Sequence, residues 1–164
     1  MKNFKLLLSC PIFLAVVVVT LFASGVAEAQ STVPFKGTFA IAESIQFIGT
    51  PQCMLAGQIS GTGLVTLVGK VTLDSIDCIN PISETEFSFS SDQLVLTVAN
   101  GDQIFATYSG ILRKEGPVGI ISGGYQIVGG TGLYSLASGA GTVQGVEDIS
   151  TGIGRVQLNG TITY

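Results

Sequence analysis

The chain has 164 residues, of which 46% are hydrophobic and only 11% are charged, and it contains 22 glycines. This composition excludes a highly charged disordered chain, a coiled coil and a collagen. A net charge of −4 argues against electrostatic binding of nucleic acid backbones. Because the chain contains no His, it cannot form a Ser-His-Asp triad, a Cys-His dyad or a His-based metal site.

Residues 1–29 are predicted to be a signal peptide. Lys2 and Lys5 precede an apolar run over 6–22, and Ala27-Glu28-Ala29 has the small residues that signal peptidase recognises. Cleavage after Ala29 would leave a single domain, 30–164, in a secreted or periplasmic location. The alternative is a retained membrane anchor, since the apolar run is nearly long enough to span a bilayer.

Two cysteines, Cys53 and Cys78, remain once Cys10 leaves with the signal peptide. An even count in an exported chain favours a disulfide, which would contribute about 3 kcal/mol by restricting the unfolded chain. Two buried free thiols are the alternative. A metal site is disfavoured because two thiols without any His are too few ligands.

The hydrophobic pattern has a period of two, which is typical of β-strands, and no stretch sustains a helical period. Asn100-Gly101, Gly116-Pro117 and the glycines of 129–132 mark turns. At most one helical turn is expected, over 133–137. The predicted strands, eight or nine in number, cover 33–47, 53–60, 63–73, 84–90, 93–99, 103–112, 118–128, 139–147 and 153–163.

Many short strands without helices predict an all-β, single-domain fold, and the length suits an eight-stranded antiparallel barrel whose closure removes the sheet edges. Glycines inside the strands fit the sharp coiling of a small barrel.

Several short segments carry a resemblance to a known group. They are Gly101-Asp102, Tyr108-Ser109-Gly110, 124–132 (GYQIVGGTG), 137–142 (ASGAGT) and Gly160-Thr161-Ile162. These segments resemble exported bacterial proteins that in turn look like the allene oxide cyclase and dirigent barrels. The resemblance implies a calycin-like barrel with a central cavity. It assigns no catalytic residue, because no motif here matches the cavity positions of the plant cyclases one by one.

Glu43 interrupts the apolar face of the first predicted strand, and a continuous strand would point it into the barrel. Burial would raise its pKa and make it suitable for proton transfer in a cyclase or isomerase. The alternatives are an inward structural acid, a β-bulge near 42–44 that turns Glu43 outward, or a strand that ends at Ala42. The expected apolar face consists of Phe35, Gly37, Phe39, Ile41, Ile45 and Phe47.

Tyr108 and Tyr125 also lie in frame with apolar residues of their strands. Either phenol could donate a hydrogen bond to a ligand in the cavity. The more common role is a core side chain whose hydroxyl meets the backbone or water.

The remaining motifs predict no chemistry. The glycines of 63–69 and 129–132 lack P-loop spacing and a following helix, so they are interpreted as turns. The acids around Cys78 and before Ser150 are expected to be solvated loop residues, too few for a calcium site. They are Asp74, Asp77, Glu84, Glu86, Glu147 and Asp148. Asn159 begins a glycosylation sequon.

The sequence therefore predicts a barrel that binds a small, mostly apolar molecule in its interior. Two alternatives stay open: a cofactor-free cyclase or isomerase with Glu43 as acid/base, and a filled barrel with a structural or interaction role. No cofactor, metal or nucleic acid partner is expected. No membrane contact is expected after signal removal, and a homo-oligomer is possible.

Overall fold

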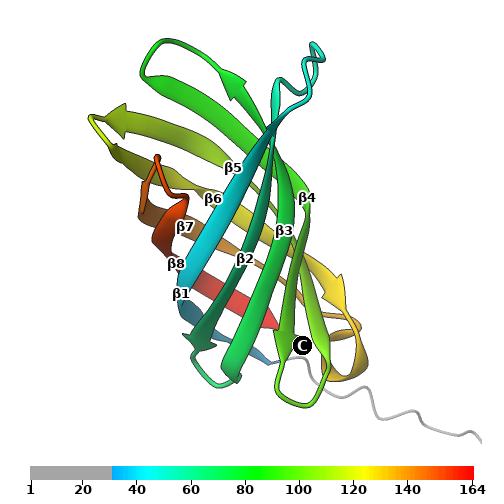
Figure 1. Ribbon diagram of the computed structural model, residues 1–164. Helices are drawn as coiled ribbons and strands as arrows, with labels where there is room; N and C mark the ends of the chain where they lie inside the picture. The colour runs from blue at the N-terminus through cyan, green and yellow to red at the C-terminus, as the bar shows by residue number, and fades with distance from the viewer. Residues whose placement is uncertain (1–30) are drawn as a thin grey trace, which may run out of the picture.

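The computed structural model describes residues 31–164, so the predicted signal peptide lies outside the described residues. Eight strands and one short 3-10 helix make up this part of the chain (Figure 1). They are β1 (Thr32–Phe47), β2 (Leu55–Val65), β3 (Gly69–Pro81), β4 (Glu86–Val98), β5 (Gln103–Glu115), β6 (Val118–Gly130), η1 (Gly132–Tyr134), β7 (Ser138–Asp148) and β8 (Ile153–Thr163). Within residues 31–164, no helix has the length and apolar character needed to cross a membrane.

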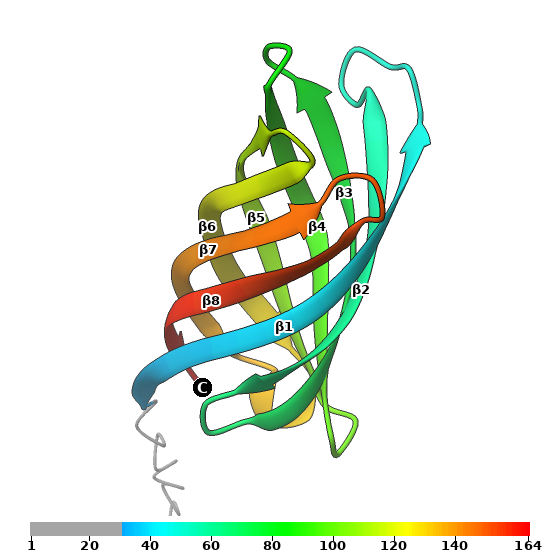
Figure 2. The same ribbon diagram turned by 60° about the vertical axis from the view of Figure 1, so that its left-hand side comes forward.

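The strands pair antiparallel in sequence order and close into a barrel, as the sequence predicted. Closure is made by β1, which pairs with β2 on one side and with β8 on the other (Figure 2). The β1–β8 ladder runs in unbroken register from Thr32↔Thr163 to Ala42↔Ile153. No sheet edge is therefore left open along the first two thirds of β1.

Two strand boundaries differ from the sequence prediction. The expected break near 61–62 is absent, because β2 runs through Gly61-Thr62-Gly63 and turns only after Val65. The turn instead uses Leu67, whose φ of 65° is unusual for a residue with a side chain. The two strands expected over 84–90 and 93–99 form one strand, β4, with a β-bulge between Ser91 and Leu94.

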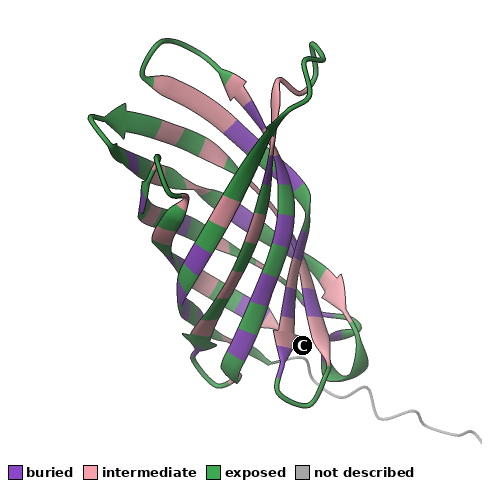
Figure 3. Ribbon diagram, viewed as in Figure 1, coloured by how far each residue is buried: buried purple, intermediate pink, exposed green. Residues whose placement is uncertain are grey.

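Burial alternates along each strand, so buried and exposed bands succeed one another around the barrel (Figure 3). In β3 every second residue from Val71 to Ile79 is buried, while Thr72, Asp74 and Ile76 are exposed. This alternation is the period of two that the sequence shows, and it places one face of every strand in a single interior core.

Inward aromatic rings lie opposite glycines of the neighbouring strand. A Cβ atom at Gly63 would lie 2.5 Å from Cδ1 of Phe39, and one at Gly110 would lie 2.5 Å from Cζ of Phe89. Glycine is therefore required at these positions to give the rings room. The four cross-strand pairs are Phe35↔Gly160, Phe39↔Gly63, Phe89↔Gly110 and Tyr125↔Gly141.

Large buried side chains fill one end of the barrel. Phe35 and Ile104 are fully buried there, and the helical turn expected over 133–137 is present as η1. Tyr134 of η1 is buried and its ring centroid lies 5.2 Å from that of Tyr164.

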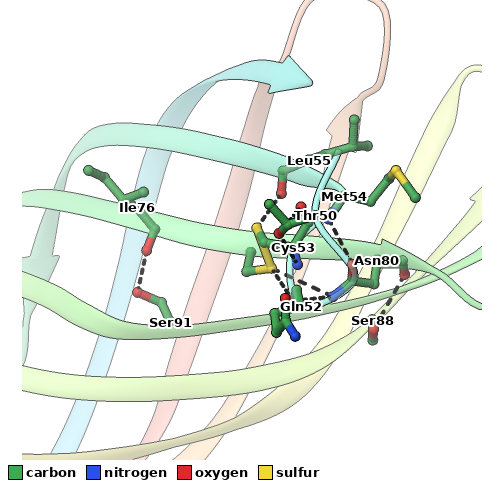
Figure 4. The surroundings of a disulfide bond; sticks show 10 residues. Thr50, Gln52, Cys53, Met54, Leu55, Ile76, Asn80, Ser88 and Ser91 are labelled. Atoms are coloured by element: carbon green, nitrogen blue, oxygen red, sulfur yellow. Dashed lines mark hydrogen bonds between the residues drawn. A yellow bond between two sulfur atoms is a disulfide. The ribbon is translucent and has the colours of Figure 1, made fainter. Parts of the chain in front are cut away.

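The predicted disulfide between Cys53 and Cys78 is confirmed (Figure 4). It joins the β1–β2 loop to β3, with Cα atoms 5.3 Å apart. Asn80 reinforces this link, since its side chain accepts a hydrogen bond from the Met54 amide (2.8 Å) and donates one to the Gln52 carbonyl (3.1 Å). The loop is thereby held against the strand that carries Asp77.

Candidate functional site

A cavity of about 80 Å³ lies inside the barrel, and all eight strands contribute to its wall. This is about half the volume of a roughly 150 Å³ cavity that accommodates benzene. Most of the wall is apolar, with side chains such as Leu73, Phe89, Leu94, Val143 and Leu158. The polar groups on the wall are Glu43, Ser75, Asp77, Tyr108, Tyr125 and Glu147.

Glu43 points into this cavity from β1, as the continuous-strand interpretation predicts. The strand passes through position 43 without a bulge, because Glu43 pairs in register with Ile59 of β2. The Glu43 amide donates a hydrogen bond to the Gly152 carbonyl at 2.8 Å. The outward-facing alternatives for Glu43 are therefore wrong. The apolar face ends sooner than expected, since Ile45 and Phe47 are exposed.

Asp77 and Glu147 also line the cavity, so the expectation that they are solvated loop residues was wrong. Their exposed fractions are only 5% and 6%. Asp77 lies within β3, in frame with Leu73 and Ile79, and Glu147 lies within β7, in frame with Val143. Glu147 already lay in the strand predicted over 139–147, in frame with Val143, and extending the alternation four residues past Leu73 would have placed Asp77 inside as well.

A missing side chain at Gly57 makes room for two of these carboxyl groups. A Cβ atom there would collide with Oε1 of Glu43 and would lie 2.5 Å from Oδ1 of Asp77. The two carboxyl groups therefore share the space that a side chain at position 57 would fill. The side chain of Glu147 likewise lies over a glycine, since a Cβ atom at Gly119 would lie 3.1 Å from Cγ of Glu147.

Burial dominates the electrostatics of the carboxyl groups. Desolvation, followed by repulsion from Glu147 and Asp77, raises the pKa of Glu43 to about 8. Desolvation also raises the pKa of Glu147, although a hydrogen bond with Glu43 acts in the opposite direction. With a pKa of about 8, Glu43 keeps its proton at neutral pH beside Glu147.

Asp77 is held by a hydroxyl network on β3, β4 and β5. The Tyr108 hydroxyl donates to Oδ2 of Asp77 at 3.2 Å and lies 3.0 Å from Oγ of Ser75. Ser91 extends the network, with its Oγ 3.2 Å from that of Ser75, and it donates to the Ile76 carbonyl in the gap left by the β4 bulge. Desolvation raises the pKa of Asp77 to about 6, against the lowering effect of the Tyr108 hydrogen bond.

Two buried polar atoms of the cavity have no hydrogen-bond partner. They are Oδ1 of Asp77 and the hydroxyl of Tyr125, whose residue is only 3% exposed. Burial raises the pKa of Tyr125 to about 12, so the phenol stays neutral. Unpaired buried polar groups are costly and uncommon, and a bound molecule is one way to satisfy them.

The structure thus brings together all three residues proposed from the sequence, Glu43, Tyr108 and Tyr125, on one cavity wall. It adds Ser75, Asp77 and Glu147. Among residues 31–164, no three or more His, Cys, Asp or Glu side chains are arranged to hold a metal ion.

No protein-family model matches the chain, and no curated protein matches it in sequence. Its fold is similar to the solved structure of the pterocarpan synthase dirigent protein GePTS1. The TM-score is 0.59 at 13% sequence identity, and the match covers 94% of this chain and 99% of that chain. The chain therefore has the fold of a dirigent-like eight-stranded barrel. At this identity the likeness concerns the fold alone.

The raised pKa of Glu43 predicts a stability that falls as pH increases. The folded protein keeps the Glu43 proton up to about pH 8, whereas an unfolded glutamate loses it near 4.5. The stabilisation is therefore complete below pH 4.5 and is lost as pH rises through 8. Glu43→Gln should remove this loss, leaving the variant about 1–3 kcal/mol more stable than wild type at pH 8 and nearly equal to it at pH 4.5. Urea unfolding across this pH range measures the effect.

Glu84→Gln in the exposed β3–β4 turn is the matched control, and its stability profile should follow that of the wild type. A Glu43→Gln variant that is less stable at every pH would show instead that Glu43 is a structural, hydrogen-bonded acid.

The two cavity tyrosines should respond oppositely to loss of their hydroxyl groups. Tyr108→Phe removes a donor to Asp77 and should lower the free energy of unfolding by about 1–3 kcal/mol. Tyr125→Phe removes a hydroxyl without a partner and should leave stability unchanged or slightly raised. Urea unfolding of both variants at pH 7 tests the network, and equal losses would contradict it.

Proposed function

We propose that the barrel binds a small, mostly apolar molecule in its interior. The observation that carries this proposal is the cavity, whose wall is apolar apart from a few convergent polar groups. Sites of this kind are typical of small-molecule binding, and eight-stranded barrels have room for one small ligand. The unpaired atoms of Asp77 and Tyr125 support the proposal because they offer hydrogen bonds that the protein itself does not use.

Export to an oxidising compartment is part of the proposal. The Cys53–Cys78 disulfide supports it, since such bonds persist mainly outside the cytosol. The predicted signal peptide over 1–29 supplies the route. A ligand would then be captured from the extracellular or periplasmic fluid.

Cavity filling tests ligand binding. The wild type is titrated with short-chain alcohols, ketones and amines, and its methyl NMR signals are followed. We expect the signals of the inward Leu73 and Leu94 to shift and the signal of the outward Leu64 to stay unchanged. Ile121→Phe places a ring into the cavity and should abolish these shifts, because Ile121 lines the wall. Its neighbour Ile120 faces outward, so Ile120→Phe is the control and should keep them. If no member of the panel shifts the inward signals, binding in the cavity is refuted.

The Glu43–Glu147 pair favours a second candidate function, proton-transfer catalysis. A pair with one shared proton contains both an acid and a base at neutral pH. On a ketone, the carboxylate would take a proton from the α-carbon while the carboxylic acid gives its proton to the carbonyl oxygen. The enol that forms would return by the reverse steps, with no cofactor.

Exchange of the α-hydrogens of 2-butanone with heavy water measures this chemistry. The wild type should accelerate exchange at pD 7, and Glu43→Gln should lose the acceleration because the pair no longer holds both an acid and a base. Glu84→Gln should exchange as the wild type does. Equal rates with wild type and Glu43→Gln would exclude Glu43 as the acid/base.

A further inference from the structure

The cavity has an unbalanced set of charges. Glu43, Asp77 and Glu147 line it, whereas no Lys or Arg among the described residues does. The only ion pair within residues 31–164 joins Arg113 to Glu86 on the surface, at 3.1 Å. Buried acids without a cationic partner favour a positively charged ligand and disfavour a negatively charged one.

One acid also has an unused acceptor atom. Oδ2 of Asp77 already receives the Tyr108 hydroxyl, but Oδ1 has no partner and the residue is 5% exposed. An N–H or O–H group of a ligand is needed to satisfy this oxygen. The hydroxyl of Tyr125, on a separate strand, is a second buried polar atom without a hydrogen-bond partner.

Apolar wall residues lie on both sides of the acids along the barrel, with Ile79 beyond Asp77 on β3 and Leu94 and Leu158 on the side of the packed end. Glu43 and Glu147 lie near the ends of β1 and β7, away from the packed end. Leu94 and Leu158 lie closer to that packed end and are buried. A ligand with a polar head and a short apolar body matches this order.

We propose that the cavity binds a small primary amine in its ammonium form. The –NH3+ group lies among Glu43, Asp77 and Glu147, and the apolar body packs against Leu94 and Leu158. This inference rests on the proposed function and names the class of its ligand. An ammonium group has three donors and no acceptor, so it can donate both to Oδ1 of Asp77 and to Glu43, whose carboxyl groups meet beside Gly57.

Ammonium binding exchanges one positive charge for another. In the ligand-free protein the Glu43–Glu147 pair holds a proton, and the entering ammonium replaces it while that proton leaves to solvent. The amine itself stays protonated, so charge is conserved. The other titratable groups facing the site are Tyr108 from β5 and Tyr125 from β6. Among the described residues, β2, β4 and β8 contribute none to the wall.

Three probes of equal chain length test the proposal: butylamine, 1-butanol and butyrate, each titrated at pH 7 by calorimetry and methyl NMR. Butylamine should bind at least tenfold more tightly than 1-butanol, and butyrate should not bind. The butylamine enthalpy should depend on the ionisation enthalpy of the buffer, because a proton is released. The 1-butanol enthalpy should not.

Asp77→Asn keeps the shape of the side chain but removes its charge, and it should reduce butylamine affinity at least tenfold with little change for 1-butanol. Asp74→Asn is the matched control, since Asp74 is exposed on the outer face of the same strand. Gly57→Ala is a second variant. It should also lose butylamine binding, because its Cβ atom takes the space of the two carboxyl groups.

The outcomes separate the two proposals. Equal binding of 1-butanol and butylamine would overturn the ammonium ligand and leave the apolar binding function intact. Failure of the whole short-chain panel to shift the inward methyl signals would overturn both. Displacement of butylamine by calcium chloride from the same signals would assign the acids to a metal ion and overturn the amine.

Discussion

Burial of carboxyl groups in an apolar barrel is the constraint on which the rest of the site depends. A charged carboxylate inside such a cavity costs several kcal/mol unless it is paired. Two features lower this cost: Asp77 receives a hydrogen bond from Tyr108, and Glu43, whose pKa burial raises to about 8, keeps its proton at neutral pH. Both arrangements lower the cost without a cation. The resulting wall differs from the apolar interior of a barrel filled only for stability.

The scaffold makes these acids possible through its glycines. Large inward side chains lie opposite glycines of the next strand. The missing side chain at Gly110 leaves space for the ring of Phe89, and the missing side chain at Gly57 leaves space for two carboxyl groups. The filled half of the barrel, with Phe35 and Ile104 fully buried, supplies the stability. Because the core at the packed end is separate from the cavity, the protein can keep buried polar groups that lower its stability and still retain a well-packed core.

Much of this arrangement could be predicted from the sequence, because alternation with a period of two reports directly which side of a strand is buried. It predicted the barrel and the inward direction of Glu43, whereas the disulfide was predicted from the even number of cysteines left after signal removal. The interpretation failed for Asp77 and Glu147 because acids beside turn-forming residues suggest loops. Asp77 lies beyond the strand predicted over 63–73, whereas Glu147 is the last residue of the strand predicted over 139–147 and was still assigned to a loop. Contacts across strands, such as Tyr108 with Asp77, depend on the register of non-adjacent strands, which no local pattern specifies.

The two proposed functions, binding and catalysis, are compatible in one cavity. A shared proton at the Glu43–Glu147 pair is the feature that an ammonium ligand would displace and that a carbonyl ligand would use. A bound amine would form hydrogen bonds with the acids and prevent them from transferring protons. A neutral carbonyl compound would leave the carboxyl proton in place, close enough to be donated to the carbonyl oxygen. On these two proposals, the charge of the occupant would decide which function the cavity performs, and the described residues of the wall include no Lys or Arg that would exclude either.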